Sequence, residues 1–199
     1  MTAPKVLGLT GPPGAGKSAV LQWMHDRGAK VMDADAVVRD ILHQDRDVTD
    51  RIAARFGFPA GSEIDRARLA GIVFADEQAL TDLESIVHPA VSARIHVWIK
   101  GLAGTVGVVE AIKLTQSDLV AWCESLWLVM CDRSVRIERL RTRGWTDEES
   151  ERRTRAAPPL GKELALASVV IDNSGPWTHT SRQLEAAWSR SVPEAGGES

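Results

Sequence analysis

The stretch GLTGPPGAGKSAV at residues 8–20 limits what this chain can fold into more than any other part of the sequence. Gly11, followed by Gly16, Lys17 and Ser18, fits the pattern G-x-x-x-x-G-K-[ST]. A short apolar run precedes the pattern, and apolar residues at helical spacing follow it, as a strand–loop–helix unit requires. Glycines let backbone N–H groups point at phosphate oxygens, and the next helix adds the positive end of its dipole. The stretch therefore predicts a loop that binds the phosphates of a nucleotide.

Every residue of this loop is a candidate nucleotide ligand. The set is Gly11, Pro12, Pro13, Gly14, Ala15, Gly16, Lys17 and Ser18. Lys17 would reach the β- and γ-phosphates, and Ser18 would hold Mg²⁺ through its hydroxyl. The loop alone indicates a nucleoside triphosphate but not the reaction.

Length, composition and charge narrow the class of protein. A chain of 199 residues with 44% hydrophobic residues suits one α/β core with room for an insertion. The net charge of −3 gives no electrostatic reason to expect nucleic acid or an anionic membrane as partner. No run of 18 apolar residues occurs, and the first residues lack the pattern of a signal peptide, so we expect a cytoplasmic protein without membrane spans. Cys123 and Cys131 are expected to be reduced and packed.

Five short apolar runs recur along the chain between helical stretches, at 5–10, 29–35, 105–112, 126–131 and 168–173. This alternation predicts an α/β fold with a five-stranded parallel sheet and helices on both faces. The stretch between the second and third runs is too long for one crossover helix and has helical patterns. It predicts an inserted helical region over 36–100, in which Pro89 would kink or break the last long helix.

An arginine-rich segment at 136–162 lies between the fourth and fifth runs, with seven arginines from Arg136 to Arg155. Such a charge run is usually a solvated, salt-bridged helical face. Arginine, however, binds phosphate oxygens bidentately, and this segment follows a strand of a phosphate-binding sheet. It is predicted to form a lid in which at least one arginine contacts phosphate and the others lie on the surface.

Two acidic residues, Asp33 and Asp35, end the second apolar run. Open α/β sheets place their ligands at this carboxyl end of the strands. In an extended strand, residues two apart project to the same side. One carboxylate could then accept a proton from an acceptor hydroxyl while the other holds magnesium-bound water. Alternatively, one of the two caps the next helix, because Asp is a favoured N-cap residue.

From Val6 to about Gly175, the chain resembles the dephospho-coenzyme A kinase family. The resemblance rests on the order and spacing of the segments GLTGPPGAGKS, DADAVVR, FGFPAGSEIDRARLAGIVF, LESIVHPAV and IDNSG. It implies a single P-loop kinase chain over 1–199 that transfers phosphate from ATP, with Mg²⁺, to the ribose 3′-hydroxyl of dephospho-CoA. The insertion at 36–100 would be the CoA-binding region.

The resemblance also implies roles for individual residues. The expected catalytic residues are Asp35 as the base, Lys17 and Arg143. The expected nucleotide ligands beyond the loop are Arg139, Arg143, Asn173 and Gly175, the last two in a segment that would cradle adenine. The expected acceptor-binding residues are Asp33, Asp35, Arg39, Glu110 and His88, the last in a His88–Pro89 turn.

The third apolar run departs from the family pattern. The family reads D-x-P-L-L-x-E where this chain reads EAIKLTQ, so Glu110 stands for the Asp and Gln116 for the Glu. Two further departures are Ala157 for a Gln and Ser168 for an Asp. Glu110 is expected to keep a carboxylate beside the acceptor or the hydrated magnesium. An internal salt bridge with Lys113 is the alternative.

Other functions remain open at this stage. Another P-loop kinase of small molecules, such as a nucleoside monophosphate kinase, would use a different acceptor. A non-catalytic relative that binds nucleotide or CoA is favoured by the departures in the third run. A regulatory GTPase is disfavoured because no N-K-x-D-type stretch occurs. A monomer without nucleic-acid partners is expected.

Overall fold

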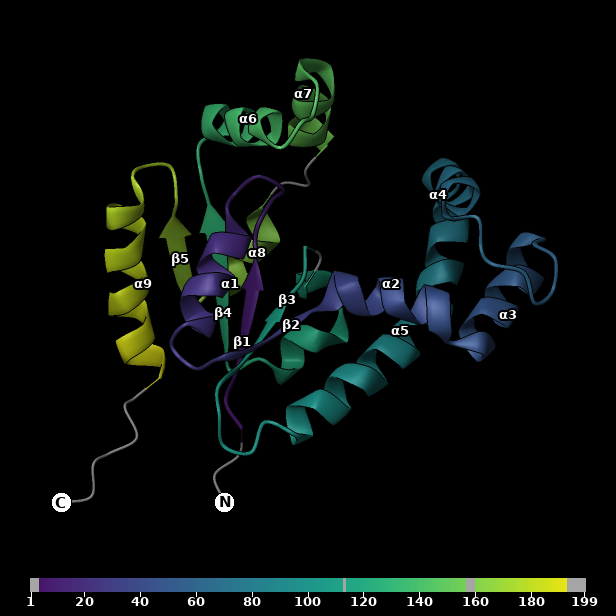
Figure 1. The fold of residues 1–199 in the computed structure, drawn as a ribbon, viewed down its shortest axis with the longest axis horizontal. Helices are drawn as coiled ribbons and strands as arrows, with labels where there is room; N and C mark the ends of the chain where they lie inside the picture. Colours follow the sequence, from purple (N-terminus) through teal and green to yellow (C-terminus); the bar gives the residue numbers. More distant parts are fainter. Residues whose placement is uncertain (1–3, 113, 157–159, 193–199) are drawn as a thin grey trace. The chain divides into compact units, whose positions relative to one another are not determined.

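The computed structural model describes residues 4–112, 114–156 and 160–192 (Figure 1). The chain divides into two compact units. The first unit comprises Met1–Met32 with Leu102–Ser199, and the second comprises Asp33–Gly101. The predicted inserted region at 36–100 falls within the second unit.

The first unit is built on a five-stranded sheet with the strand order β2-β3-β1-β4-β5. The strands are β1 (Val6–Thr10), β2 (Lys30–Asp33), β3 (Gly107–Glu110), β4 (Ser125–Met130) and β5 (Val169–Asp172). All five run parallel, as predicted. In the register of the sheet, Leu9 of β1 lies between Glu110 of β3 and Trp127 of β4. The sheet therefore places Glu110 one residue before the point where β1 ends.

Helices α1 (Lys17–His25) and α9 (Trp177–Ser191) cover one face of this sheet (Figure 1). The strands contribute Leu7, Leu9, Val108, Trp127, Val129 and Ile171 to their common core. The helices contribute Val20, Trp23, Met24, Leu184 and Ala187. Burial of this much apolar surface fixes the start of α1 against the end of β1.

The opposite face is covered by α8 (Gly161–Leu166) and by two short 3-10 helices, η1 (Leu114–Gln116) and η2 (Asp118–Trp122). The 3-10 helices approach β1 closely, because a Cβ added at Gly8 would lie 2.7 Å from the Leu114 side chain of η1 and 3.1 Å from the sulfur of Cys123, which follows η2. Helices on both faces of the sheet were expected, and this expectation is confirmed.

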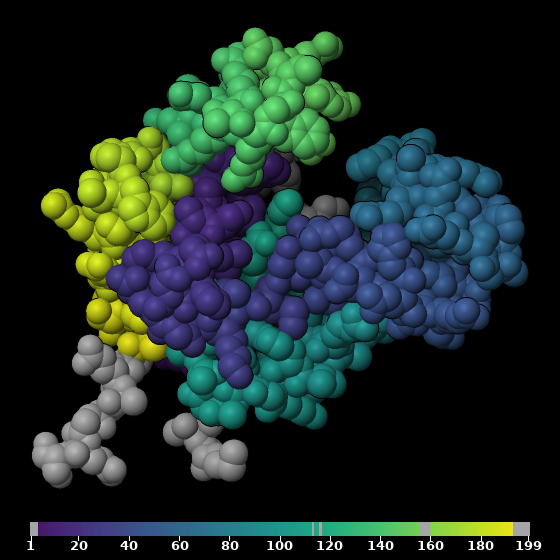
Figure 2. Space-filling model, viewed as in Figure 1, coloured from purple at the N-terminus to yellow at the C-terminus, as the bar shows by residue number. Residues whose placement is uncertain are grey.

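Two further helices, α6 (Arg133–Thr142) and α7 (Asp147–Ala156), follow β4. They pack on each other, and ion pairs from Arg141 to Asp147 and from Arg133 to Glu151 join them. Much of the pair is exposed, and Figure 2 shows it in green on the surface of the face drawn. These helices make up most of the predicted lid segment at 136–162.

The second unit is helical, and each of its four helices begins after an aspartate. The helices are α2 (Ala34–Gln44), α3 (Arg46–Phe56), α4 (Arg66–Ala75) and α5 (Glu77–Lys100). The capping residues, whose carboxylates accept hydrogen bonds from first-turn N–H groups, are Asp33, Asp45, Asp65 and Asp76. Capping by Asp therefore determines where each helix of this unit begins.

Pro89 does not break the last long helix, because α5 runs without interruption from Glu77 to Lys100, and the kink expected as the alternative stays a prediction. Proline removes one backbone hydrogen bond, the one to the carbonyl of Ser85. Ser85 and Pro89 are both exposed, so water can satisfy that carbonyl. His88 therefore lies in the middle of a helix and not in a turn. In the described part of the chain, no helix has the length and apolar character needed to span a membrane.

Candidate active site

The predicted phosphate loop connects β1 to α1 in the first unit. Gly16 has a left-handed backbone with φ 95°, and a Cβ added there would clash with the Asn173 amide. A Cβ added at Gly11 would clash with the Val129 carbonyl of β4. The loop thus needs glycine at both positions of the motif, for backbone conformation at Gly16 and for close packing at Gly11.

Four backbone N–H groups of this loop are available to an anion. Those of Gly14 and Gly16 donate no hydrogen bond to another described residue. Those of Lys17 and Ser18 lie in the first turn of α1, where no intrahelical acceptor exists. Together with the positive end of the helix dipole, these donors suit a phosphate group. The residues present therefore fit the nucleotide that the sequence predicts.

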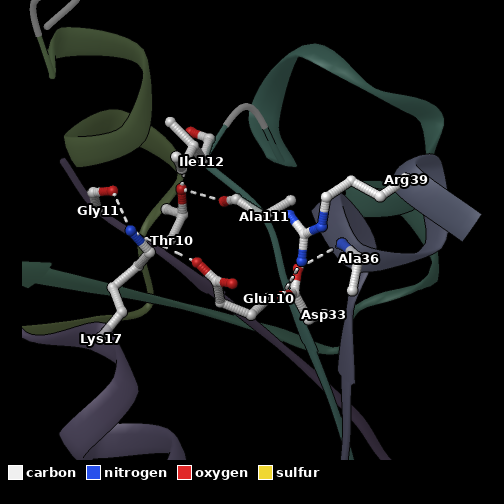
Figure 3. Close-up of polar contacts among 9 residues, drawn as sticks. All are labelled: Thr10, Gly11, Lys17, Asp33, Ala36, Arg39, Glu110, Ala111 and Ile112. Carbon is white, nitrogen blue, oxygen red and sulfur yellow. Dashed lines mark hydrogen bonds and ion pairs between the residues drawn. The ribbon is translucent and has the colours of Figure 1, made fainter. Parts of the chain in front are cut away.

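Lys17 lies inside the loop and is held by two groups. Its Nζ donates to the Gly11 carbonyl at 2.9 Å and lies 3.4 Å from Glu110 Oε1 (Figure 3). Both side chains of this ion pair are only 11% exposed. Glu110 thus lies beside the phosphate loop. The alternative partner, Lys113, lies outside the described residues.

The arrangement also suits magnesium held together with phosphate. No cluster of three or more His, Cys, Asp or Glu side chains forms a metal site in residues 4–112, 114–156 and 160–192. Mg²⁺ in kinases is usually bound by one or two protein groups plus phosphate oxygens and water. The exposed Ser18 hydroxyl, which bonds to no other described residue, and the Glu110 carboxylate are suitable donors.

Side chains from elsewhere in the first unit bind the outer carbonyl groups of the loop. Arg136 Nε donates to the Pro13 carbonyl at 3.1 Å, and Arg139 Nη1 donates to the Ala15 carbonyl at 3.2 Å. Asn173 Nδ2 donates to the same Ala15 carbonyl at 2.8 Å. Two of these residues, Arg139 and Asn173, were predicted to bind nucleotide, and both contact the loop itself. Arg136 was not singled out, because nothing in the sequence separates it from its neighbours in the arginine run.

Arg136 is half-buried, and this desolvation lowers the pKa of its guanidinium below the usual value. Its Nη2 is buried and has no hydrogen-bond partner among the residues described. A buried guanidinium nitrogen without an acceptor is costly in free energy. This donor, close to the loop, makes an anion a favourable neighbour.

The remaining arginines of the run have different environments. Arg141, Arg152 and Arg155 form ion pairs with Asp147, Glu149 and Glu151, and Arg153 lies over the Trp145 ring at 3.7 Å. These four belong to the salt-bridged surface that a charge run usually forms. Arg143 follows α6, is exposed, and has no side-chain partner among the described residues. It is therefore available to a ligand, whereas most of its neighbours are not.

The segment after β5 is tightly bonded within the protein. Asn173 is 4% exposed, and its Oδ1 accepts a hydrogen bond from Thr180 Oγ1 at 2.9 Å. Hydrogen bonds from Ser174 lower the pKa of the Asp172 carboxyl. Gly175 is exposed. Both polar ends of the Asn173 side chain therefore bond to protein, and contact with adenine through Gly175 stays a prediction.

In the second unit, Asp33 and Asp35 do not project from one extended strand as expected. The strand β2 ends at Asp33, and the backbone is helical from Ala34. Asp33 Oδ1 accepts from the Ala36 N–H at 2.9 Å, and Oδ2 lies 3.4 Å from Arg39 (Figure 3). Asp33 is thus the N-cap of α2, which was the alternative interpretation. Asp35 lies half-buried in the first turn, and the roles of Arg39 and the exposed His88 stay predictions.

The fold and the site together define the class of protein to which the chain belongs. A phosphate loop with free N–H groups leads from β1, the central strand of a five-stranded parallel sheet, into a helix. An arginine-rich segment follows the neighbouring strand β4. This is the architecture of a P-loop kinase. The fold agrees with a solved shikimate kinase from Acinetobacter baumannii, with a TM-score of 0.53 over 97% of this chain and 96% of that one at 11% identity.

The family model for dephospho-CoA kinase matches residues 5–178. A dephospho-CoA kinase from Geobacillus kaustophilus is 37% identical over 187 residues, which cover 90% of this chain and 93% of that protein. A crystal structure of TT1252 from Thermus thermophilus is 27% identical with a TM-score of 0.81, over 98% of this chain and 100% of that one. The chain belongs to the dephospho-CoA kinase family. As a kinase of the P-loop fold, it uses ATP.

Proposed function

We propose that this protein transfers the γ-phosphoryl group of ATP to the ribose 3′-hydroxyl of dephospho-CoA, giving coenzyme A and ADP. The observation that carries the proposal is the extent of the family match. It covers residues 5–178, and so includes both the phosphate loop and the whole of the second unit at 33–101. A match of that extent favours the family's substrate over that of another P-loop kinase.

At the phosphoryl group, the roles follow from the contacts in the first unit. The N–H groups of Gly16, Lys17 and Ser18 would bind phosphate oxygens. The Lys17 ammonium, which now contacts Gly11 and Glu110, would bind the β- and γ-phosphates instead. Arg143, whose guanidinium has no partner within the described residues, would stabilise charge on the transferred group.

Mg²⁺ bound with ATP would neutralise charge on the phosphates, with Ser18 and Glu110 as the protein groups that hold it or its water. Glu110 keeps the carboxylate that the family places at this position, one methylene longer. The proposal therefore includes a magnesium-dependent reaction.

At the acceptor, Asp35 is the proposed base for the 3′-hydroxyl. The choice follows the family resemblance, which aligns the base with the second Asp of the DADAVVR segment, and Asp33 already serves as the N-cap of α2. The second unit would bind the CoA moiety, with Arg39 and His88 as contacts. The Arg39 side chain is half-exposed, so its guanidinium is accessible to the anionic groups of an acceptor that binds from solution.

The test is to incubate the protein with Mg-ATP and one acceptor at a time, and to measure ADP. The acceptors are dephospho-CoA, AMP, shikimate and gluconate. Of the four acceptors, we expect only dephospho-CoA to give acceptor-dependent ADP. We also expect the enzyme to be a monomer and to act in the cytoplasm. ADP with a different acceptor would show another small-molecule kinase, and ATP binding without ADP would show a non-catalytic relative.

A further inference from the structure

A short chain of buried hydrogen bonds runs from α9 to the phosphate loop. Thr180, on the first turns of α9, is fully buried, and its Oγ1 donates to Asn173 Oδ1 at 2.9 Å. Asn173 Nδ2 in turn donates to the Ala15 carbonyl at 2.8 Å. Both bonds are buried, so water does not compete with either of them. Thr180 is thus linked to the loop through the Asn173 side chain.

The two bonds fix the orientation of the Asn173 amide. The Ala15 carbonyl can only accept a hydrogen bond, so it requires the amide NH₂ on its side. The Thr180 hydroxyl supplies the donor for the amide oxygen on the other side. A rotated amide would lose the bond to Ala15 and place two oxygens against each other. Without the hydroxyl, Oδ1 would be buried with no donor from the part of the chain that the structure describes, which is unfavourable.

The position of the Ala15 carbonyl determines where the next N–H group points. A trans peptide is planar, and its C=O and N–H point in opposite directions. The Ala15 carbonyl is bonded by Asn173 and also by Arg139 Nη1 at 3.2 Å. The Gly16 N–H therefore points away from these two side chains. It donates to no described residue and is available to a phosphate oxygen.

We propose that Thr180 is a positioning residue for ATP. Through Asn173 it holds the Ala15–Gly16 peptide in the orientation that presents the Gly16 N–H to phosphate. The Asn173 side chain then supports the loop and does not bind adenine. This inference rests on the proposed function for the identity of its ligand. If the hydroxyl is removed, a smaller fraction of molecules has the loop in the binding-competent conformation, and the apparent ATP affinity falls in proportion to that fraction.

A purely structural role for Thr180 would have a different signature. It would lower the thermal unfolding temperature without changing ATP affinity in the folded protein. Thr105 is the matched control, since its hydroxyl also makes one hydrogen bond, to the Leu102 carbonyl. It precedes β3 at the end of the strand opposite to Glu110, away from the phosphate loop. Thr105→Val removes a hydroxyl hydrogen bond from the same unit, one that is partly buried.

The experiment compares the parent with Thr180→Val, Thr180→Ser and Thr105→Val. Calorimetric titrations give Kd for Mg-ATP and, separately, for dephospho-CoA, and thermal unfolding gives stability. We expect Thr180→Val to raise Kd for ATP about tenfold, which is about 1.4 kcal/mol and lies in the range of one hydrogen bond. Thr180→Ser keeps the hydroxyl and should stay within about twofold of the parent. Thr105→Val should lower the unfolding temperature only, and no variant should change Kd for dephospho-CoA.

Equal ATP affinity in the parent and in Thr180→Val overturns the inference. So does an equal loss of affinity for both ligands, or the same loss in Thr105→Val. If Thr180→Val does not fold, Asn173→Asp serves instead, because it places a carboxylate oxygen against the Ala15 carbonyl. Unchanged ATP binding in that variant also overturns the inference.

These outcomes are separate from those of the proposed function. A parent protein that binds ATP but transfers no phosphate contradicts the function and leaves the role of Thr180 to be decided by the Kd ratios. A parent protein that binds no ATP overturns both.

Discussion

Replacing Glu110 by Asp or by Gln separates a catalytic role of this carboxylate from a structural one. Glu110 is 8% exposed, and its Oε1 lies 3.4 Å from Lys17 Nζ. Glu110→Asp keeps the charge and moves it back by one methylene. Glu110→Gln keeps the length and removes the charge.

The distance gives the size of the expected effect. At 3.4 Å and an effective dielectric of about 20, the attraction between Glu110 and Lys17 is about 5 kcal/mol. One C–C bond further away, about 1.5 Å, it is about 3.4 kcal/mol. A carboxylate that acts over a similar distance on magnesium or its water would lose a similar amount, about 1.5 kcal/mol, which is about a factor of ten in rate, whereas Gln removes the charge altogether. Glu110→Asp should therefore keep turnover within about tenfold of the parent or raise it. Glu110→Gln should lower turnover by about 100-fold or more, as removal of an electrostatic contact with a reacting phosphate does.

The assay is steady-state turnover with saturating Mg-ATP and dephospho-CoA, with thermal unfolding measured on the same samples. A role in the reaction separates the two variants in turnover at similar unfolding temperatures. Equal turnover in Glu110→Asp and Glu110→Gln would refute the reasoning and leave Glu110 as a structural partner of Lys17.

Three further outcomes are expected. Lys17→Ala should lower phosphoryl transfer roughly 10²–10³-fold in a folded protein, because it removes the cation at the transferred group, and near-normal activity would exclude this loop as the reaction centre. Asp35→Asn should lower turnover roughly 10²–10⁴-fold with little change in Kd for ATP, and a larger loss in Asp33→Asn would contradict the assignment of the base. Burial raises the pKa of the Cys123 thiol from about 9 to about 11. Because the folded state then holds a proton that the unfolded state releases, the free energy of unfolding should fall as pH rises from about 9 towards 11. Cys123→Ala should reduce this pH dependence, measured by urea unfolding; an unchanged slope would argue against it.

The phosphate loop and the five strands could be predicted because their signals are local. The residues around Gly16 and Lys17 predict the loop and also the strand and the helix that flank it. Each strand is a short apolar run that stops where polar residues begin. Such patterns do not depend on which distant residues pack nearby, so the structure agrees with them.

The supports of the loop could not be predicted, because they join residues far apart in the chain. The bond from Asn173 to Ala15 spans 158 residues, and that from Arg136 to Pro13 spans 123. Nothing in the sequence distinguishes Thr180 from the other threonines. Only packing in three dimensions shows that it is fully buried beside an amide that it orients.

Two local predictions failed because two rules competed. For Asp33 and Asp35, an extended strand and a capped helix were both possible, and the capping bond to Ala36 decided for the helix. At Pro89, the ring disfavours a helix, but buried residues before and after it, Ile86 and Val91, hold α5 together. Tertiary contacts outweigh one lost hydrogen bond there.

The central claim is that phosphate from ATP reaches the 3′-hydroxyl of dephospho-CoA, and identification of the product tests it most directly. The protein is incubated with Mg-ATP and dephospho-CoA, and the product is analysed by mass spectrometry and ³¹P NMR. The account predicts one product, coenzyme A with its 3′-phosphate, formed in equal amount to ADP. ADP formed without a phosphorylated acceptor, or phosphate found at another hydroxyl, would contradict it.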